Sequence, residues 1–176
     1  MEFYRPCLLD VDKHRRDEFD CGDTSLNEWL QRYAGQNRRR DTAATWVVVD
    51  DQGRVAAYAC VAMTSIDRSA APARLAKGAP IRVLGLLIGR LGVDQGAAGH
   101  GLGTALVQYI LRKAVEINAL AACRAVVVDA LNPGAFRWWQ RSGFVPFDPD
   151  DESNLDLYLL TGDIERTLAE ARDGLG

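Results

Sequence analysis

The sequence predicts a mixed α/β fold in which one sheet is flanked by helices. Three observations lead to this prediction. The length of 176 residues suits one domain with one substantial core, so residues 1–176 are expected to form a single domain. The composition, with 48% hydrophobic and 26% charged residues, is that of an ordinary globular protein. Short apolar runs and amphipathic segments follow one another in the order β-α-β-β-β-α-β-α-β-β.

The chain is expected to begin with a strand and an amphipathic helix. The strand covers residues 3–9. Ser25 and Glu28 have the spacing of a capping box, which marks the start of a helix. Gly35 and the arginines behind it are expected to close this helix in a loop. The apolar residues that give the helix its spacing of i, i+3, i+4 and i+7 are Leu26, Trp29, Leu30 and Tyr33.

A hairpin and a long strand come next. Residues 45–49 and 54–63 are β-rich runs separated by turn residues, which predicts a hairpin. Residues 65–80 contain two prolines and predict a loop, with a short helix at most. Residues 83–93 predict a long apolar strand, and the glycines inside it indicate a bulge or the close approach of another group.

The second half of the chain alternates helices and strands. A helix from about residue 102 to 120 is predicted by an apolar stripe, and residues 125–129 read as a short buried strand. Asn132 and Pro133 are expected to start another helix, with asparagine as its N-cap. The last predicted elements are strands at 144–147 and 155–160 and a short terminal helix at 163–171.

Several classes of protein are excluded by composition and spacing. The start of the chain lacks the basic and apolar blocks of a signal peptide. No apolar run approaches the roughly 20 residues that span a bilayer, so we expect a cytoplasmic protein without a membrane segment. The cysteines lie far apart and the two histidines do not cluster with them, so neither a metal site nor a disulfide framework is expected. The cysteines are Cys7, Cys21, Cys60 and Cys123.

The charge is unevenly divided along the chain. The net charge is −3, but residues 148–176 carry nine acids and two bases, which leaves +4 on the rest. Basic residues gather at 38–40 and again between 68 and 90. Such patches suit a phosphate backbone, although they also suit a solvated surface.

A glycine cluster lies between the long strand and the helix at residue 102. Gly99, Gly101 and Gly103 alternate with other residues. At a helix N-terminus, free backbone N–H groups and the positive end of the helix dipole point at one place and can hold an anion. The spacing GxGxG differs from the dinucleotide fingerprint GxGxxG, and the Gly-Lys-Ser/Thr of a P-loop is absent. Two interpretations of the glycine cluster remain: a glycine-rich turn without a ligand, or a pyrophosphate-binding loop of another family.

The segment Ala98-Gly99-His100-Gly101-Leu102-Gly103 resembles the pyrophosphate loop Q/R-x-x-G-x-G/A of the GNAT acetyltransferases. Ala98 stands where Gln or Arg is usual, which removes a side-chain contact and keeps the backbone amides. Over residues 5–171 the chain looks like the TacT/AtaT-type toxins of bacterial toxin–antitoxin pairs. The segments that carry this likeness are 19–22, 26–30, 87–94, 129–130, Ala135 and 141–144.

This resemblance implies a fold, a reaction and partners. The GNAT fold has a central, mixed and mostly antiparallel sheet flanked by helices, and acetyl-coenzyme A is the cofactor. Toxins of this type acetylate the α-amino group of the amino acid on charged tRNA, which stops translation. They are usually homodimers and are neutralised by a ribbon-helix-helix antitoxin encoded beside them.

The resemblance also implies roles for individual residues. The backbone of Leu91 and Val93 would hold the pantetheine arm, and the Val93 N–H would polarise the thioester carbonyl. Asn132 and Trp138 would line the cofactor. The phosphate cradle would consist of Ala98, Gly99, His100, Gly101, Leu102, Gly103 and Thr104. The tRNA would be bound by Arg38, Arg39, Arg40, Arg74, Lys77 and Arg90, with an ion pair at the sheet edge as the alternative for Arg90.

One position departs from the family pattern. In the run from Ala135 to Phe144, Trp139 occupies the place of the tyrosine that acts as general acid toward the leaving thiolate. An indole N–H donates a hydrogen bond but does not titrate usefully. Two interpretations follow: Trp139 places its N–H against the thioester sulfur, or Trp138 and Trp139 pack the cofactor wall or the core. No general base is identified.

Three functions therefore compete. The first is an acetyltransferase toxin that modifies aminoacyl-tRNA. The second is a GNAT enzyme that acetylates a small amine or a protein, for which acidic residues would be expected near the amine. The third is a catalytically impaired module that binds acyl-coenzyme A, which the residues at positions 98 and 139 make plausible. The basic stretch between residues 68 and 90 favours the first.

Overall fold

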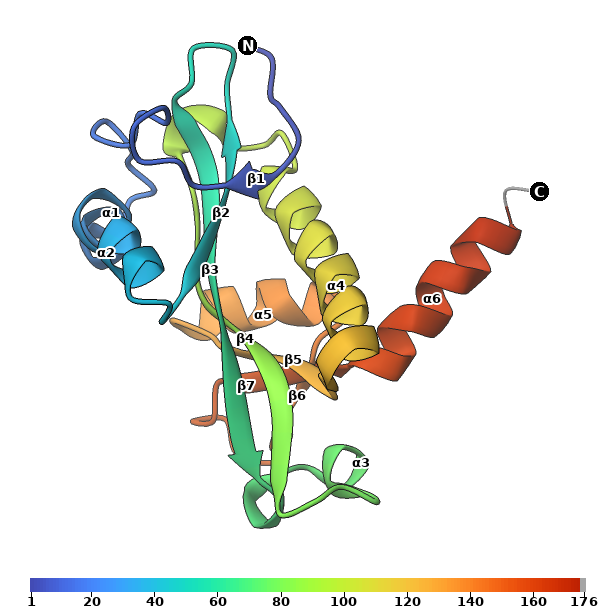
Figure 1. The fold of residues 1–176 in the computed structure, drawn as a ribbon. Helices are drawn as coiled ribbons and strands as arrows, with labels where there is room; N and C mark the ends of the chain where they lie inside the picture. The colour runs from blue at the N-terminus through green and yellow to red at the C-terminus, as the bar shows by residue number, and fades with distance from the viewer. Residues whose placement is uncertain (175–176) are drawn as a thin grey trace. The chain divides into compact units, whose positions relative to one another are not determined.

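Seven strands, in the order β1-β2-β3-β4-β5-β7-β6, make up the sheet of the computed structural model, which describes residues 1–174 (Figure 1). The described chain forms two compact units. Unit 1 contains residues 1–62 and 88–109, and unit 2 contains residues 63–87 and the chain from Ile110 onward. The two long strands β3 (Val55–Asp67) and β4 (Arg82–Val93) each contribute to both units.

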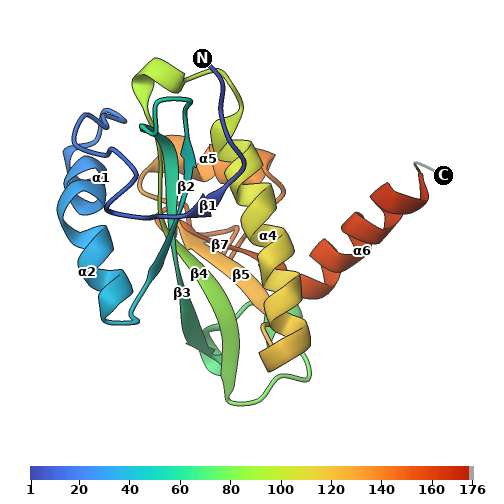
Figure 2. The same cartoon turned by 45° about the horizontal axis from the view of Figure 1, so that its top comes forward.

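The strands of unit 1 form an antiparallel ribbon. β1 (Cys7–Leu8) pairs with β2 (Ala44–Val49), and β2 pairs with β3, so the predicted hairpin is confirmed. Figure 2 shows β1 beside β2 at the sheet edge. The strand predicted over residues 3–9 is interrupted: Phe3 forms an isolated bridge with Asp50 and pairing resumes only at Cys7. Pro6 lies between these pairs and has no N–H to donate.

The helical segment of unit 1 runs farther than the sequence suggests. It consists of α1 (Thr24–Glu28), a π-helix (Trp29–Tyr33) and α2 (Ala34–Arg39). The N-cap is Asp23, whose carboxylate accepts the Leu26 N–H at 2.9 Å, so the placement of the cap at Ser25 was wrong. Gly35 does not end the helix. A Cβ at Gly35 would lie 3.0 Å from Val11 Cγ1, so this glycine is explained by close packing.

The core of unit 1 is aromatic. Tyr58 is fully buried, with Phe19 packed edge-on at 5.4 Å between ring centroids and Trp29 stacked on it at 5.9 Å. The Tyr58 hydroxyl donates a hydrogen bond to the Leu26 carbonyl at 2.8 Å. This contact fixes the start of the helical segment against β3. A Cβ at Gly92 of β4 would lie 3.1 Å from the Tyr58 ring, which confirms the predicted close approach.

Unit 2 contains the remaining strands. β5 (Ala125–Asp129) pairs antiparallel with β7 (Asp156–Leu160), which also pairs with β6 (Val145–Pro146). Its core consists of Leu75, Ala79, Val83, Ala125, Val127 and Tyr158. β6 is shorter than predicted because the Phe144 N–H donates to the Trp139 carbonyl and so belongs to the preceding helix end.

The helices of unit 2 agree with the sequence in type and differ in their ends. The segment 65–80 holds a 3₁₀ turn (Arg68–Ala70) and α3 (Ala73–Ala76). α4 (Leu102–Ala121) begins in unit 1 and ends in unit 2. α5 (Pro133–Arg141) starts as predicted, with the Asn132 side chain accepting the Ala135 N–H at 2.9 Å. α6 (Thr161–Asp173) extends away from the strands of its unit (Figure 1).

Candidate functional site

The loop from β4 to α4 has the geometry of an anion cradle. Asp94 begins a short 3₁₀ turn (Gln95–Ala97), with Oδ1 accepting the Gly96 N–H at 2.8 Å. Gly99 and Gly101 follow, with φ of +81° and +70°. The Gly101 carbonyl accepts the Ala105 N–H at 3.0 Å, which closes the first turn of α4. The loop therefore ends where a 20-residue helix leaves its first N–H groups without partners inside the helix.

The space beside the two glycines fits a phosphate group. A Cβ built at Gly99 or Gly101 would meet no heavy atom within 4 Å. Both glycines adopt the left-handed region, which L side chains rarely occupy. An anion can therefore approach the backbone here, and a side chain at either position would fill that space. The predicted cradle residues 98–104 lie together in unit 1.

Leu91 and Val93 also belong to unit 1, on the C-terminal half of β4. Both are half-buried. Arg90, beside them, lies over the Trp29 ring at 5.4 Å from its centroid, so the ion pair offered as its alternative role is replaced by a cation–π contact. This contact involves the first residue of the π-helix, a type of distortion that is frequent at functional sites. No sequence pattern indicates this contact.

Unit 2 contains the two predicted cofactor-binding residues Asn132 and Trp138. It also contains Trp139, which replaces the tyrosine of the family pattern. Asn132 is exposed, and its side-chain oxygen is engaged in capping α5. Trp139 is buried, with its ring edge-on to Trp138 at 4.9 Å and to Phe144 at 5.0 Å. Trp138 is half-buried. The packing interpretation of these two tryptophans therefore has direct support in their contacts.

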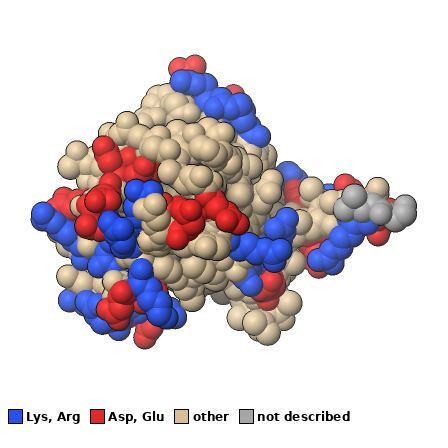
Figure 3. All heavy atoms as spheres, turned by 90° about the horizontal axis from the view of Figure 1, so that it is seen from above, with Lys and Arg blue, Asp and Glu red and all other residues tan. Residues whose placement is uncertain are grey.

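The basic residues predicted to bind tRNA are divided between the two units. Arg38, Arg39 and Arg40 are exposed at the end of α2 in unit 1. Arg74 and Lys77 lie in unit 2, where Arg74 makes an ion pair with Asp163 at 3.0 Å. Positive and negative side chains are interspersed over the face shown in Figure 3.

Titratable groups in the aromatic core of unit 1 are poorly suited to proton transfer. Burial raises the pKa of the Tyr58 hydroxyl far above its usual value. Burial likewise raises the pKa of the Cys60 thiol to about 11. Both groups therefore stay protonated at neutral pH. Among the described residues, His, Cys, Asp and Glu form no group of three that could hold a metal ion, and no helix is long and apolar enough to cross a membrane.

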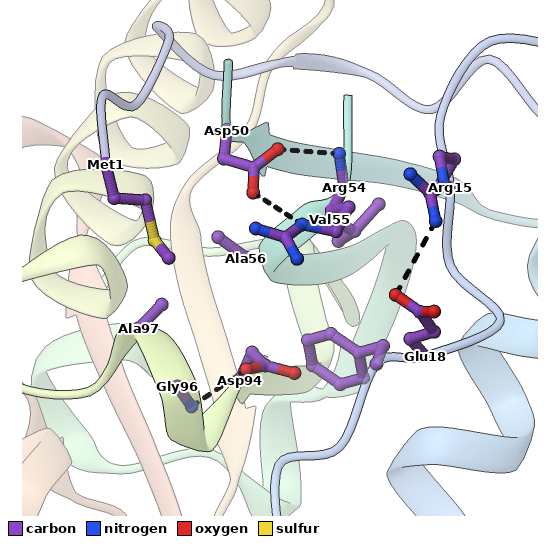
Figure 4. Close-up of a pocket in the computed structure, with 11 residues that line it drawn as sticks. Met1, Arg15, Glu18, Asp50, Arg54, Val55, Ala56, Asp94, Gly96 and Ala97 are labelled. Carbon is purple, nitrogen blue, oxygen red and sulfur yellow. Dashed lines mark hydrogen bonds and ion pairs between the residues drawn. The ribbon is translucent and has the colours of Figure 1, made fainter. Parts of the chain in front are cut away.

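A second feature of unit 1 is a cavity of about 190 Å³ between the hairpin end and the 3₁₀ turn (Figure 4). Its charged side chains are engaged with neighbours. Asp50 binds Arg54 Nε at 2.8 Å, Arg15 lies 3.6 Å from Glu18, and Asp94 accepts the N–H of Gly96. We interpret these contacts as holding the hairpin and the turn in shape.

Replacing Asp50 with asparagine is expected to lower the melting temperature by a few degrees at neutral pH. Burial raises the pKa of Asp50, but hydrogen bonds from the Arg54 N–H and guanidinium and the Gln52 N–H outweigh it, so the pKa lies below the usual value. Because the pKa is lower in the folded state than in the unfolded state, the ionised carboxylate stabilises the fold at pH values above the unfolded-state pKa. This stabilisation is lost as the pH falls through the folded-state pKa. Thermal melts of both proteins from pH 7 to pH 3 should therefore converge in acid. A gap that stays constant with pH would contradict this.

Fold and loop together define a class: enzymes that hold a phosphate-bearing cofactor at the junction of a strand, a glycine turn and a helix. The chain belongs to the acetyltransferase (GNAT) family, whose model matches residues 8–144. The family and the fold that the resemblance implied are thus confirmed, and the chain is an acetyl-coenzyme A-dependent N-acetyltransferase.

Individual relatives agree with this assignment. A tRNA-acetylating toxin of Mycobacterium tuberculosis is 30% identical over 142 residues, which covers 81% of this chain and 82% of the relative. The fold is similar to AtaT complexed with acetyl-methionyl-tRNAfMet, with a TM-score of 0.85, 21% identity and coverage of 95% and 99% of the two chains. It is also similar to a tyrosine-to-phenylalanine variant of KacT, with a TM-score of 0.84, 23% identity and coverage of 93% and 99%.

Proposed function

We propose that this chain acetylates the α-amino group of the amino acid carried on charged tRNA and so acts as a toxin that blocks translation. The observation that carries the proposal is the likeness to the mycobacterial tRNA-acetylating toxin, which is 30% identical over four fifths of both chains. In the reaction the amine nitrogen bonds to the thioester carbonyl carbon, the carbon–sulfur bond breaks, and coenzyme A leaves as thiolate. The amine gives up one proton to solvent, which balances the negative charge of the departing thiolate.

The cofactor would be held chiefly by backbone groups of unit 1. The backbone N–H groups of residues 99–104 would bind the pyrophosphate, with Gly99 and Gly101 supplying the close approach. The backbone of Leu91 and Val93 would align the pantetheine arm, and the Val93 N–H would stabilise negative charge on the carbonyl oxygen. Ala98 contributes no side-chain contact.

Asn132 and Trp138 would supply further contacts to the cofactor. Because the Asn132 oxygen is engaged in capping α5, its amide N–H group is the part left to donate. Bound acetyl-coenzyme A supplies the activated acetyl group. The remaining chemistry, orientation of the amine and stabilisation of charge, is assigned to the protein.

Proton transfer can be slow in this enzyme without abolishing the reaction. The α-amine of a chain end has a pKa of roughly 7.7 to 8.0, so part of it is neutral at pH 7, and an aminoacyl ester is less basic still. Loss of general acid catalysis lowers the rate by about 10²- to 10⁴-fold, which orientation and oxyanion stabilisation partly offset. We assign to Trp139 the donation of its indole N–H toward the thioester sulfur.

The phosphate backbone of the tRNA would be bound by exposed arginine and lysine side chains. Arg38, Arg39 and Arg40 are the strongest candidates because all three are exposed at a helix end. Lys77 is exposed as well, whereas Arg74 would have to exchange its ion pair with Asp163 for a phosphate. Arg90 would act from its place over Trp29.

The partners proposed for this chain follow its relatives. AtaT has been solved bound to the C-terminus of its antitoxin AtaR, in a structure with a TM-score of 0.80 to this chain. We propose an antitoxin for this chain too, of the ribbon-helix-helix type, together with a homodimeric state and a cytoplasmic location.

Transfer of radiolabelled acetyl from acetyl-coenzyme A to a pool of aminoacylated tRNA tests the proposal. We expect label on the charged pool and none on a matched uncharged pool, because only the former offers the α-amine. Base treatment that cleaves the aminoacyl ester should release the label as an acetylated amino acid. Equal labelling of the two pools would contradict the proposal. No label with intact cofactor binding would favour another amine or a binding module.

A further inference from the structure

The N-terminal segment of the chain lies against the end of the β2–β3 hairpin. Phe3 forms an antiparallel bridge with Asp50. The Tyr4 N–H donates to the Val49 carbonyl at 2.9 Å, and the Asp51 N–H donates to the Glu2 carbonyl at 3.1 Å. Residues 2–4 therefore have a defined backbone, and Met1 lines the cavity in Figure 4 together with the 3₁₀ turn.

This segment contacts the proposed cofactor loop through one aromatic pair. The Phe3 ring packs against the His100 ring with 5.3 Å between centroids and 66° between planes, an edge-to-face arrangement that aromatic rings favour. Both residues belong to unit 1. Phe3 is half-buried, so its ring is partly removed from water by this packing.

The His100 side chain in turn ties the loop to the turn before it. Its Nδ1 lies 3.1 Å from the Ala97 carbonyl oxygen and 3.2 Å from that of Ala98. Because both neighbours can only accept, Nδ1 must carry the proton in this geometry. His100 stands between Gly99 and Gly101, so its ring is attached to the backbone at a position where both neighbours have positive φ.

The role of the His100 ring follows from the conformational freedom of the two glycines beside it. Glycine loses more conformational freedom on ordering than any other residue, and the loop contains two glycines on either side of His100. Anchoring the residue between them reduces the number of loop conformations before a ligand arrives, and such preorganisation strengthens binding.

We infer that Phe3 and His100 are positioning residues that hold the loop in the shape that binds the phosphates of acetyl-coenzyme A. This inference rests on the proposed placement of the cofactor at residues 99–104. Phe3 touches neither the reacting amine nor the thioester in this role. Its loss should therefore weaken cofactor binding and leave the chemical step unchanged.

The test compares Phe3→Ala with Tyr4→Ala and Phe3→Tyr. We expect Phe3→Ala to raise the dissociation constant and the KM for acetyl-coenzyme A by about fivefold to tenfold, the factor that an aromatic pair supplies, with kcat within twofold. Phe3→Tyr keeps the ring and should restore binding. Tyr4, 54% exposed on the same segment, is the control, and Tyr4→Ala should bind like the unaltered protein.

Calorimetric titration with acetyl-coenzyme A alone gives the dissociation constant without any tRNA, so the outcome does not depend on which amine is acetylated. Melting temperatures separate weaker binding from loss of fold. Unchanged affinity in Phe3→Ala, or an equal loss in Tyr4→Ala, would overturn the inference. A fall in kcat with KM unchanged would overturn it as well.

Discussion

Replacing Gly101 with alanine should raise the KM for acetyl-coenzyme A by about 100-fold. Two effects combine. Gly101 has φ of +70°, where a Cβ destabilises the backbone by about 1–2 kcal/mol, so the loop would leave the shape that exposes its N–H groups. The new Cβ would also project into space that is open to 4 Å and that we assign to a phosphate.

Gly162→Ala is the matched control for this experiment. A Cβ at Gly162 likewise meets no heavy atom within 4 Å, but this glycine lies in α6 with φ outside the left-handed region. Alanine there should leave cofactor binding unchanged. Steady-state kinetics with varied acetyl-coenzyme A, together with calorimetric titration, measure both variants. If Gly101→Ala binds acetyl-coenzyme A as tightly as the unaltered protein, the pyrophosphate does not lie against this loop.

Trp139 carries the second large effect, and here stability and chemistry have to be separated. Trp139 is 6% exposed and packs on Trp138 and Phe144, so Trp139→Ala should destabilise the fold by about 3–5 kcal/mol. Trp139→Phe keeps a six-membered aromatic ring and removes the five-membered ring of the indole together with its N–H. It should lower kcat by about tenfold, the worth of one hydrogen bond, with the KM for acetyl-coenzyme A unchanged.

Melting curves and single-turnover acetyl transfer measure the two effects separately. Trp46→Phe is the control, because it removes an indole N–H from a half-buried tryptophan of β2 that has no assigned role in binding or catalysis, so kcat should stay unchanged. An unaltered kcat in Trp139→Phe would refute donation to the sulfur and leave packing as the role of this residue.

Several elements could be predicted because their signals are local. The N-cap at Asn132, the strand 125–129 and the helix beginning at residue 102 depend on residues a few positions apart, and the structure confirms them. The glycine spacing of the loop is a local signal of the same kind, since Gly99 and Gly101 permit the positive φ that they have in the structure. The class of enzyme followed from the resemblance of this loop and of several further segments to a known family.

Contacts between distant segments could not be read in this way. The close packing that explains Gly35 in α2 involves Val11, which lies 24 positions earlier in the chain. The ion pair of Arg74 depends on Asp163, and it changes how that arginine can meet a phosphate. No periodicity links such partners, because burial and hydrogen bonding select them only after the chain has folded.

By itself, then, the sequence determined the type and order of most elements and the glycine spacing of the loop between β4 and α4, since these depend on local backbone preference. Its resemblance to the GNAT acetyltransferases indicated the family. Tertiary structure alone decided that Arg90 lies over Trp29 and that Phe3 packs against His100. The physical reason is that side-chain contacts of long sequence separation are fixed by packing and by removal of surface from water, and neither leaves a pattern in the neighbouring residues.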